Sequence, residues 1–187
     1  TTFFNRPDNV AKWIEIAFDN GFKHFDGAQF YRTEVGMGVG LNKLLTSGKA
    51  KRSEIFVTTK IHPILWDKEK VQFINTKLEK CLQPVQCCLN MTFKILASIH
   101  QSLVNLQLDH VDLLLIHCAG VIPAVLESDF NNIEYKQPFP TTPEEFKELR
   151  VEAWEVLQKA KELGLAKHIG VSNWTRFHIE QLISDDR

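Results

Sequence analysis

Apolar residues along this chain follow a helical period in some stretches and form short continuous runs in others. Helical spacing, with apolar residues three or four positions apart, marks five segments: residues 8–20, 33–47, 96–106, 143–163 and a last segment after 175. Short apolar or β-branched runs predict four strands: residues 22–26, 55–60, 111–117 and 168–172. Helices and strands therefore alternate. This order predicts an α/β fold with a parallel sheet and right-handed crossovers.

Several residues mark where these helices begin and end. Thr33 and Thr175 stand at helix starts, where a hydroxyl can cap the first turn, and Gly21 follows the first helix as a candidate C-cap. Glycines at 36, 38 and 40 weaken the second helix, because each costs about 1 kcal/mol relative to alanine. This run lacks the GxGxxG spacing of dinucleotide-binding loops and lies inside a helix, so we interpret it as a site of helix packing.

Two segments interrupt this alternation. Residues 119–143 contain four prolines and no steady period, so we expect a long loop after the strand at 111–117. Residues 72–94 contain three of the four cysteines and do not continue the strand-to-helix rhythm. We interpret 72–94 as an atypical segment, either a true insertion or an error in the gene model.

The composition is that of an ordinary globular domain. Hydrophobic residues make up 44% of the 187 residues and charged residues 24%, which argues against the disordered and fibrous classes. The formal net charge of -1 argues against binding to nucleic acid through a positive surface. We expect residues 1–187 to form one domain. A (β/α)8 barrel typically needs about 250 residues, so a barrel in this chain would be partial.

The start of the chain shows no export signal, because it lacks a basic segment followed by a long apolar one. The longest apolar stretch, at 111–126, is broken by polar residues and is too short to cross a membrane. The four cysteines, at 81, 87, 88 and 118, form neither a CxxC pair nor a zinc-binding spacing. We therefore expect reduced thiols, no metal site and a cytoplasmic protein. Because the first residue is not Met, we expect the chain to be a fragment.

Polar residues gather where the predicted strands end: Asp26 and Tyr31 follow the first, Lys60 ends the second, His117 ends the third, and Ser172 with Asn173 ends the fourth. The carboxyl ends of parallel strands share one edge of the sheet, where barrel enzymes carry their catalytic residues. An Asp, a Tyr, a Lys and a His together form a proton-transfer set. A nearby ammonium stabilises a phenolate, and a histidine can orient a carbonyl group or share its proton.

Four ordered motifs carry a resemblance to a known family. They are GFKHFDGAQFYRTEVGMG at 21–38, VTTK ending at 60, LDHVDLLLIH ending at 117, and GLAKHIGVSN at 164–173. Together they resemble the aldo-keto reductases over much of the chain. The resemblance implies a (β/α)8 TIM barrel, of which this chain would hold about four βα units, strands two to five. It also implies an NADP-dependent oxidoreductase, or alcohol dehydrogenase (NADP+), that reduces an aldehyde or ketone to an alcohol.

The same resemblance assigns roles to residues at the strand ends. The family's catalytic tetrad corresponds to Asp26, Tyr31, Lys60 and His117. Tyr31 would give a proton to the carbonyl oxygen, while hydride passes from the nicotinamide of NADPH to the carbonyl carbon. Tyr31 and His117 would therefore contact the substrate, a small carbonyl compound. From the charge and the short apolar stretches we expect no nucleic-acid partner and no membrane partner.

Other residues correspond to binding positions of the family. Ser172 and Asn173 match the pair that holds the nicotinamide carboxamide, and Asp26 lies near the nicotinamide ribose in such enzymes. Trp66 corresponds to a tryptophan of the substrate pocket, although the sequence IHPILW displaces it.

The chain also departs from the family pattern. We expect barrel strands one and six to eight to be missing, together with the loops that hold the pyrophosphate and 2′-phosphate of NADPH. The interval from Lys60 to His117 exceeds the family's usual one by about the length of 72–94. The sequence assigns neither an oligomeric state nor the choice of NADPH over NADH.

Each site residue alone has an ordinary interpretation: Tyr31 as a loop-surface residue, Lys60 as a strand-end residue and His117 as a core residue. Two further hypotheses remain beside the reductase. One is a non-catalytic scaffold, or truncated pseudoenzyme, that lacks the cofactor phosphate site and binds partners through exposed strand edges. The other is a truncated gene product without a folded role. We interpret the remaining histidines and the Glu- and Lys-rich residues of 143–163 as structural or surface positions.

Overall fold

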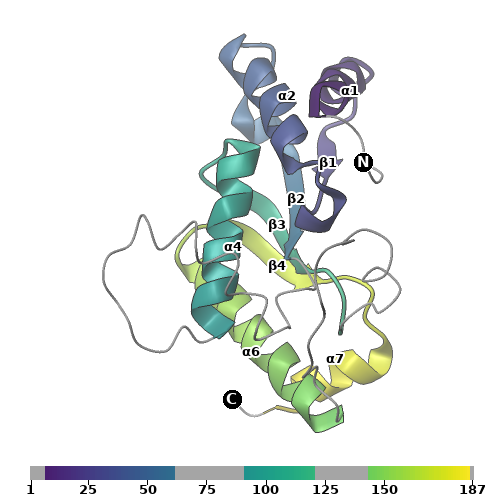
Figure 1. The fold of residues 1–187 in the computed structure, drawn as a ribbon. Helices are drawn as coiled ribbons and strands as arrows, with labels where there is room; N and C mark the ends of the chain where they lie inside the picture. Colours follow the sequence, from purple (N-terminus) through teal and green to yellow (C-terminus); the bar gives the residue numbers. More distant parts are fainter. Residues whose placement is uncertain (1–6, 62–90, 121–142, 186–187) are drawn as a thin grey trace, which may run out of the picture.

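Four parallel strands form the centre of the computed structural model, which describes residues 7–61, 91–120 and 143–185 (Figure 1). The strands are β1 (His24–Asp26), β2 (Phe56–Ile61), β3 (Val111–Ile116) and β4 (Ala166–Val171). They lie in the order β1-β2-β3-β4, and each neighbouring pair is parallel. The described residues thus form a partial α/β barrel, which confirms the predicted fold class.

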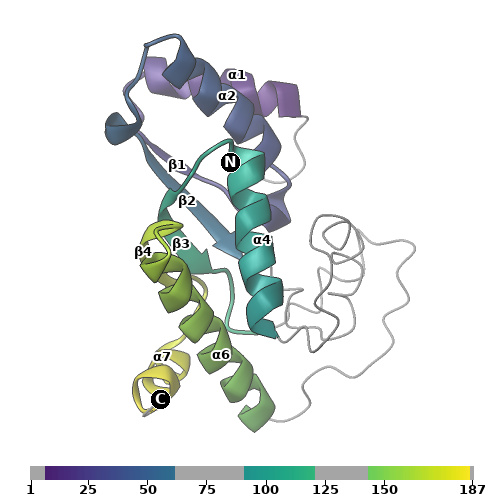
Figure 2. The same ribbon diagram turned by 90° about the vertical axis from the view of Figure 1, so that its left-hand side faces the viewer.

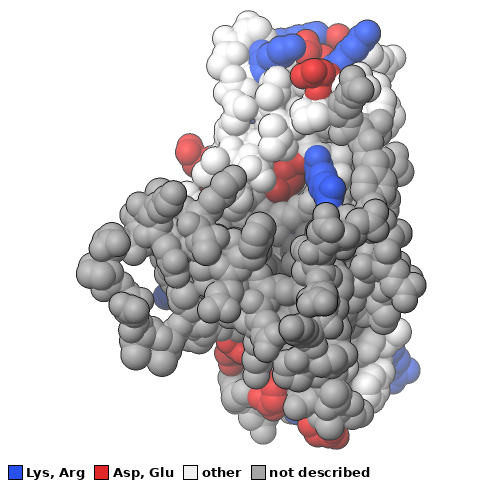
Figure 3. Space-filling model, viewed as in Figure 1, with Lys and Arg blue, Asp and Glu red and all other residues white. Residues whose placement is uncertain are grey.

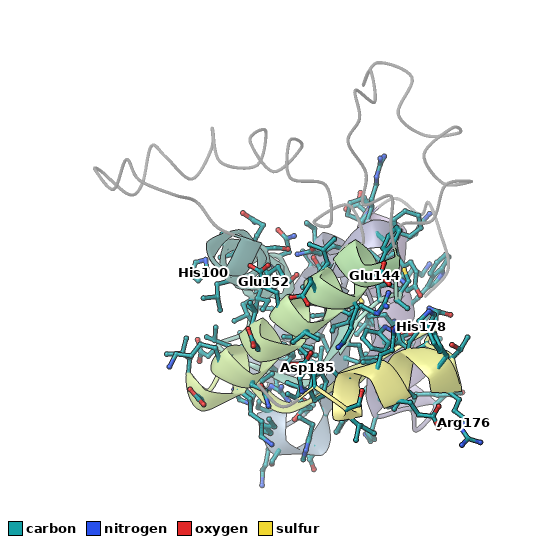
Figure 4. All side chains as sticks on the ribbon, turned by 90° about the horizontal axis from the view of Figure 1, so that it is seen from below. His100, Glu144, Glu152, Arg176, His178 and Asp185 are labelled. Carbon is teal, nitrogen blue, oxygen red and sulfur yellow. The ribbon has the colours of Figure 1, made fainter. Side chains whose placement is uncertain are left out.

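Helices connect the strands along the described part of the chain. They are α1 (Pro7–Asp19), α2 (Glu34–Thr46), α4 (Met91–Leu106), α6 (Pro143–Glu162) and α7 (Arg176–Ile183), with 3-10 turns η1 (Gln29–Tyr31) and η2 (Arg52–Glu54). α1 packs on α2, α2 on α4 and α4 on α6, so consecutive helices lie side by side (Figure 2). α7 lies against α6, beyond the end of β4 (Figure 4).

The two faces of the sheet differ in burial because side chains alternate along each strand. Val57, Leu114 and Ile116 face the helices and belong to the apolar core. The other face is the one that a closed barrel would enclose, and we call it the inner face. Its residues Phe56 and His168 are exposed. The helix-covered face therefore supplies the core, and the inner face is partly open.

The glycines of α2 allow neighbouring helices to approach closely. A Cβ at Gly36 would lie 2.5 Å from Pro7 O, and one at Gly40 would lie 2.8 Å from Ala11 O, both in α1. On the other side, a Cβ at Gly38 would collide with the backbone of α4. This confirms the interpretation of the glycine run as a helix-packing site, and the tight packing offsets the low helix propensity of glycine.

Helix ends follow the sequence signals with one exception. Gly21 has φ +90 after α1, as a C-cap requires. Thr175 precedes α7, and its N–H donates to His178 Nδ1 at 3.2 Å. The capping prediction for Thr33 is wrong: among the described residues its hydroxyl makes no capping bond and lies 3.9 Å from Met37 Sδ. The cause is the near-helical backbone of Thr33, since a capping side chain needs an extended one.

Three boundaries in the structure differ from those that the sequence predicts. β1 begins at His24 instead of residue 22, because Phe22 N–H still donates to Ala17 O at 3.0 Å in the turn after α1. β4 begins at Ala166 instead of His168, because Ala166 pairs with Val111 of β3. α4 begins at residue 91, so the atypical segment ends earlier than predicted. Several predictions lie outside the described residues: the rest of that segment, the loop at 121–142, Trp66, Cys81, Cys87 and Cys88.

A buried carboxylate joins the amino ends of three strands. Asp112 of β3 accepts hydrogen bonds from Val57 N–H of β2 at 2.9 Å and from Lys167 Nζ of β4 at 2.8 Å. It also pairs with Arg52 Nη2 at 2.8 Å. Burial alone would raise the pKa of Asp112, but the bonds from Lys167, Val57 and Arg52 outweigh burial and hold its pKa below the ordinary value. The ionised form of Asp112 therefore stabilises the fold.

Charged side chains of both signs lie close together on one face of the described residues. Figure 3 shows Lys and Arg interspersed with Asp and Glu near α1 and α2, at the top of the view. Within the described ranges, no helix is long and apolar enough to cross a membrane, and no cluster of three or more His, Cys, Asp or Glu side chains could hold a metal ion. Cys118 is a buried free thiol, and burial raises its pKa to about 11.

Candidate active site

The strand register brings the predicted site residues to one face of the sheet. Asp26, the last residue of β1, pairs with Thr58 of β2. Lys60 lies two residues beyond Thr58, so its side chain leaves the sheet on the same side as Asp26. Lys60 pairs with Leu115 of β3, and His117 lies two residues beyond Leu115. Side-chain alternation therefore places Asp26, Lys60 and His117 at the carboxyl ends of three adjacent strands, on the inner face.

Lys60 is held by two hydrogen bonds. Its Nζ donates to Asp26 Oδ1 at 2.5 Å and to Gly27 O at 3.0 Å. The Lys60 side chain is only 6% exposed, whereas that of Asp26 is 46% exposed. A buried ammonium needs both a counter-charge and hydrogen-bond acceptors. Asp26 and Gly27 supply these and fix the position of the ammonium.

Tyr31 reaches the site from η1, the turn that follows β1. The Tyr31 N–H donates to Ala28 O at 3.1 Å, and Arg32, with φ +54, ends the turn. Lys60 Nζ lies 4.9 Å from the centre of the Tyr31 ring. The ring of His117 lies edge-on to Tyr31, with 5.2 Å between the ring centres. The structure therefore brings together all four residues that the sequence predicts as catalytic.

His117 lies in the buried part of the site, beside Phe30 at a ring separation of 5.9 Å. Burial lowers the pKa of His117 to about 4; the charge of Lys60 adds to this effect and that of Asp26 opposes it. His117 Nδ1 forms no hydrogen bond within the described part of the chain. At neutral pH the imidazole is therefore uncharged and can exchange hydrogen bonds with a carbonyl group.

Ser172 and Asn173 follow β4 at the same edge of the sheet. Asn173 has φ +58, a left-handed conformation that asparagine tolerates. Its Nδ2 donates to His117 O at 2.8 Å and to Ser172 Oγ at 3.0 Å. Ser172 N–H donates to Ile116 O at 2.8 Å, which continues the pairing of β3 with β4. These bonds place a hydroxyl and a side-chain amide beside the backbone of His117.

The profile of the Aldo/keto reductase family matches residues 2–187. The chain belongs to the aldo/keto reductase family. The prostaglandin-E(2) 9-reductase of Oryctolagus cuniculus is 32% identical over 183 residues, which are 95% of this chain and 47% of that protein. The 3-alpha-hydroxysteroid dehydrogenase of Rattus norvegicus is 32% identical over 182 residues, 95% of this chain and 46% of that protein. The chain spans about half the length of the curated relatives it matches.

Solved structures of this family share the fold. An aldo-keto reductase of Bombyx mori in complex with NADP matches 97% of this chain and 46% of its own, with a TM-score of 0.65 and 27% identity. The aldose reductase of Schistosoma japonicum matches 100% of this chain and 52% of its own, with a TM-score of 0.67. Its 23% identity makes that likeness one of fold alone.

Two polar residues of this aldo/keto reductase chain lie beside the site without a sequence signal. Glu34, the first residue of α2, is buried and accepts hydrogen bonds from Thr59 Oγ1 at 2.6 Å and Asn105 Nδ2 at 3.2 Å. Gln29, in η1, bonds to α4. A polar residue in or after a loop is usually exposed, so only the tertiary contacts reveal these two.

Proposed function

We propose that this chain carries the catalytic and nicotinamide-binding part of a site that reduces an aldehyde or ketone to an alcohol with NADPH. The observation that supports this most directly is the convergence of Tyr31 on Lys60 and the uncharged His117. The names of the matched relatives, a reductase and a hydroxysteroid dehydrogenase, agree with an oxidoreductase. The substrate of this protein is proposed only as a small carbonyl compound.

NADPH, when bound, supplies a hydride to the carbonyl carbon and is itself oxidised to NADP+. Tyr31 gives its phenolic proton to the carbonyl oxygen, so that C=O becomes CH–OH. The Lys60 ammonium, 4.9 Å from the ring centre, stabilises the phenolate that remains. Asp26 holds this ammonium through the 2.5 Å bond to Oδ1. These roles depend on β1, β2 and η1, which hold Asp26, Lys60 and Tyr31, respectively.

His117 orients the substrate in this proposal. Because its pKa is lowered to about 4, the ring is uncharged at neutral pH and does not compete with Tyr31 as a cationic acid. A neutral imidazole carries one N–H, which can donate a hydrogen bond to the carbonyl oxygen. Tyr31 and His117 would thus contact the same oxygen from two sides. Trp66, expected in the substrate pocket, lies outside the described residues and remains a prediction.

The donor set at the end of β4 fits the nicotinamide end of the cofactor. A carboxamide both donates and accepts hydrogen bonds, and the Ser172 hydroxyl and the exposed Asn173 amide can do the same. Asp26 is half-exposed, so it can contact the nicotinamide ribose while it holds Lys60. We propose that these three residues bind NADPH.

Titration of NADPH against the protein expressed from its complete gene, followed by nicotinamide fluorescence, tests this assignment. Ser172→Ala should weaken NADPH binding about fivefold, the value of one lost hydrogen bond. Ser53→Ala, at an exposed position in η2, is the matched control and should stay within about twofold. Equal affinities for NADPH in the two variants would count against the cofactor site.

A non-catalytic scaffold is the second candidate function. Its binding surface would include Phe56 and His168 of the inner face, with Leu113 and Leu115 beside them. Such a scaffold would bind no NADPH and would form a stable oligomer in sedimentation experiments. A monomer that binds NADPH tightly excludes it.

A further inference from the structure

The side chain of Gln29 attaches the turn that carries Tyr31 to α4. Gln29, at the start of η1, points its amide at two serines of α4. Gln29 Nε2 lies 2.7 Å from Ser98 O, 2.7 Å from Ser98 Oγ and 2.8 Å from Ser102 Oγ. In return, Ser98 Oγ donates to Gln29 Oε1 at 2.9 Å. Both ends of the Gln29 amide are thus engaged by α4.

The two serines are placed to receive this amide. Ser98 and Ser102 are one helical turn apart, so they share one face of α4. They are 3% and 2% exposed, and buried hydroxyls need hydrogen-bond partners. Within the described ranges, Gln29 is a hydrogen-bond partner of both hydroxyls. A change at Gln29 therefore removes a set of buried hydrogen bonds between η1 and α4.

The far side of the turn is attached to the same helix. Glu34, three residues after Tyr31, accepts a hydrogen bond from Asn105 of α4 at 3.2 Å and one from Thr59 of β2 at 2.6 Å. The chain is therefore held to α4 at Gln29, before Tyr31, and again at Glu34, the first residue of α2. Between the two attachments, Arg32 takes the left-handed conformation that reverses the chain.

We propose that Gln29 is a positioning residue whose bonds to Ser98 and Ser102 fix η1, so that the Tyr31 phenol stays against Lys60 and His117. Gln29 itself takes no part in the proton transfer. That these bonds fix the position of Tyr31 follows from the hydrogen bonds alone. That a displaced Tyr31 slows the reaction rests on the proposed function. A small displacement of a catalytic group is enough to slow an enzyme, because the reaction needs close and aligned atoms.

Fluorine NMR separates these two consequences. In the protein expressed from its complete gene, labelling with 3-fluorotyrosine gives one signal for each tyrosine, and Tyr31→Phe assigns the signal of Tyr31 by its loss. Gln29→Met, which keeps the length of the side chain, should shift and broaden the Tyr31 signal. Gln158→Met makes the same chemical change at an exposed position on α6 and should leave the Tyr31 signal unchanged. This readout does not depend on enzymatic activity.

Kinetics then test the catalytic consequence in the protein expressed from its complete gene. Gln29→Met should lower kcat about tenfold, while KM and the Kd for NADPH stay within about twofold, because a displaced acid affects the reaction more than binding. Ser102→Ala removes one of these bonds without changing a residue of η1, and it should cause a smaller change of both the NMR signal and kcat. It also serves if Gln29→Met fails to fold.

A folded Gln29→Met variant with an unchanged Tyr31 signal would overturn the inference. So would a Tyr31 signal that Gln158→Met perturbs equally. If the signal moves but Tyr31→Phe retains full turnover, the attachment of η1 stands and the proposed function fails instead.

Discussion

Lys60 Nζ lies 2.5 Å from Asp26 Oδ1, and the two partners differ greatly in exposure: the Lys60 side chain is 6% exposed and that of Asp26 46%. The charge that the fold buries is thus the cation, and its counter-ion stands at the boundary with solvent. Lys60 also donates to Gly27 O, directly after β1, so Asp26 and Gly27 together fix the position of the ammonium. Catalysis by Tyr31 in our proposal depends on this arrangement.

Asp26→Asn should reduce both stability and turnover. Loss of the carboxylate leaves the Lys60 ammonium buried without its counter-charge, which we expect to lower the free energy of unfolding by about 1–2 kcal/mol, less than for a fully buried pair because Asp26 is half-exposed. Urea unfolding measures this change. Asp19→Asn, which breaks the exposed ion pair with Lys49, is the control and should cost less than about 1 kcal/mol. Equal losses of unfolding free energy in the two variants would contradict the claim that the burial of Lys60 makes its ion pair with Asp26 more important.

His117 should make stability depend on pH between about 6.5 and 4. A histidine in the unfolded chain has a pKa of about 6.5, whereas burial lowers the pKa of His117 in the fold to about 4. Between these values the unfolded chain binds a proton that the folded chain excludes, so stability falls as the pH falls. The full effect corresponds to about 3 kcal/mol.

Urea unfolding at pH 7, 6 and 5 measures this effect, because the series crosses the pKa of free histidine, about 6.5. His117→Gln removes the titrating group and should give a flatter pH dependence than the unsubstituted protein. His100→Gln, at an exposed position, should leave the slope unaltered. Parallel curves for His117→Gln and the unsubstituted protein would show that His117 is not the group that titrates.

Asp112→Asn should destabilise the amino end of the sheet. The carboxylate accepts bonds from Val57 N–H, Lys167 and Arg52, and charge-assisted bonds of this kind contribute about 1.5–3 kcal/mol. Because the pKa of Asp112 is lowered in the fold, its contribution is present at neutral pH and is lost as the pH falls through that lowered value.

Thermal unfolding at neutral pH compares Asp112→Asn with Asp109→Asn, an exposed acid three residues earlier in the chain. We expect a clear loss of stability in the first and little change in the second. A similar melting temperature for both would contradict the assigned network.

Gly38→Ala should destabilise the protein although alanine favours helices. A Cβ at Gly38 would meet Asn105 O and the backbone of Leu106, so α2 and α4 would have to separate. We expect a loss of about 2 kcal/mol or more, measured by urea unfolding. Val39→Ala, at the exposed neighbouring position of the same helix, should change stability by less than about 1 kcal/mol. A stabilised Gly38→Ala would show that helix propensity outweighs packing.

Much of the fold could be predicted from the sequence because its elements carry strong periodic signals. The run at 111–117 is apolar except for Asp112 and His117, a pattern typical of strands in a parallel sheet, and residues 111–116 form β3. The start of β4 could not be predicted as easily, because Ala166 and Lys167 join the sheet through backbone pairing that their side chains do not indicate. The prediction that Thr33 caps α2 is wrong for a similar reason, because the backbone conformation decides whether a hydroxyl can cap a helix.

Some residues of the candidate site could likewise be predicted from the sequence, and others could not. Asp26, Lys60 and His117 end strands whose register is fixed by the hydrophobic pattern, so their shared face was predictable. Gln29 and Glu34 were not, because their partners lie on α4 and β2, far along the chain. Long-range hydrogen bonds of single polar residues leave no period in a sequence.

The most direct test of the central claim is the turnover of Tyr31→Phe in the protein expressed from its complete gene. NADPH-dependent reduction of nitrobenzaldehyde should fall by about a hundredfold or more, as loss of a general acid predicts, while the Kd for NADPH stays within about twofold. Tyr135→Phe, the same change at the second tyrosine of these 187 residues, should retain its activity. Undiminished turnover in Tyr31→Phe would contradict the account.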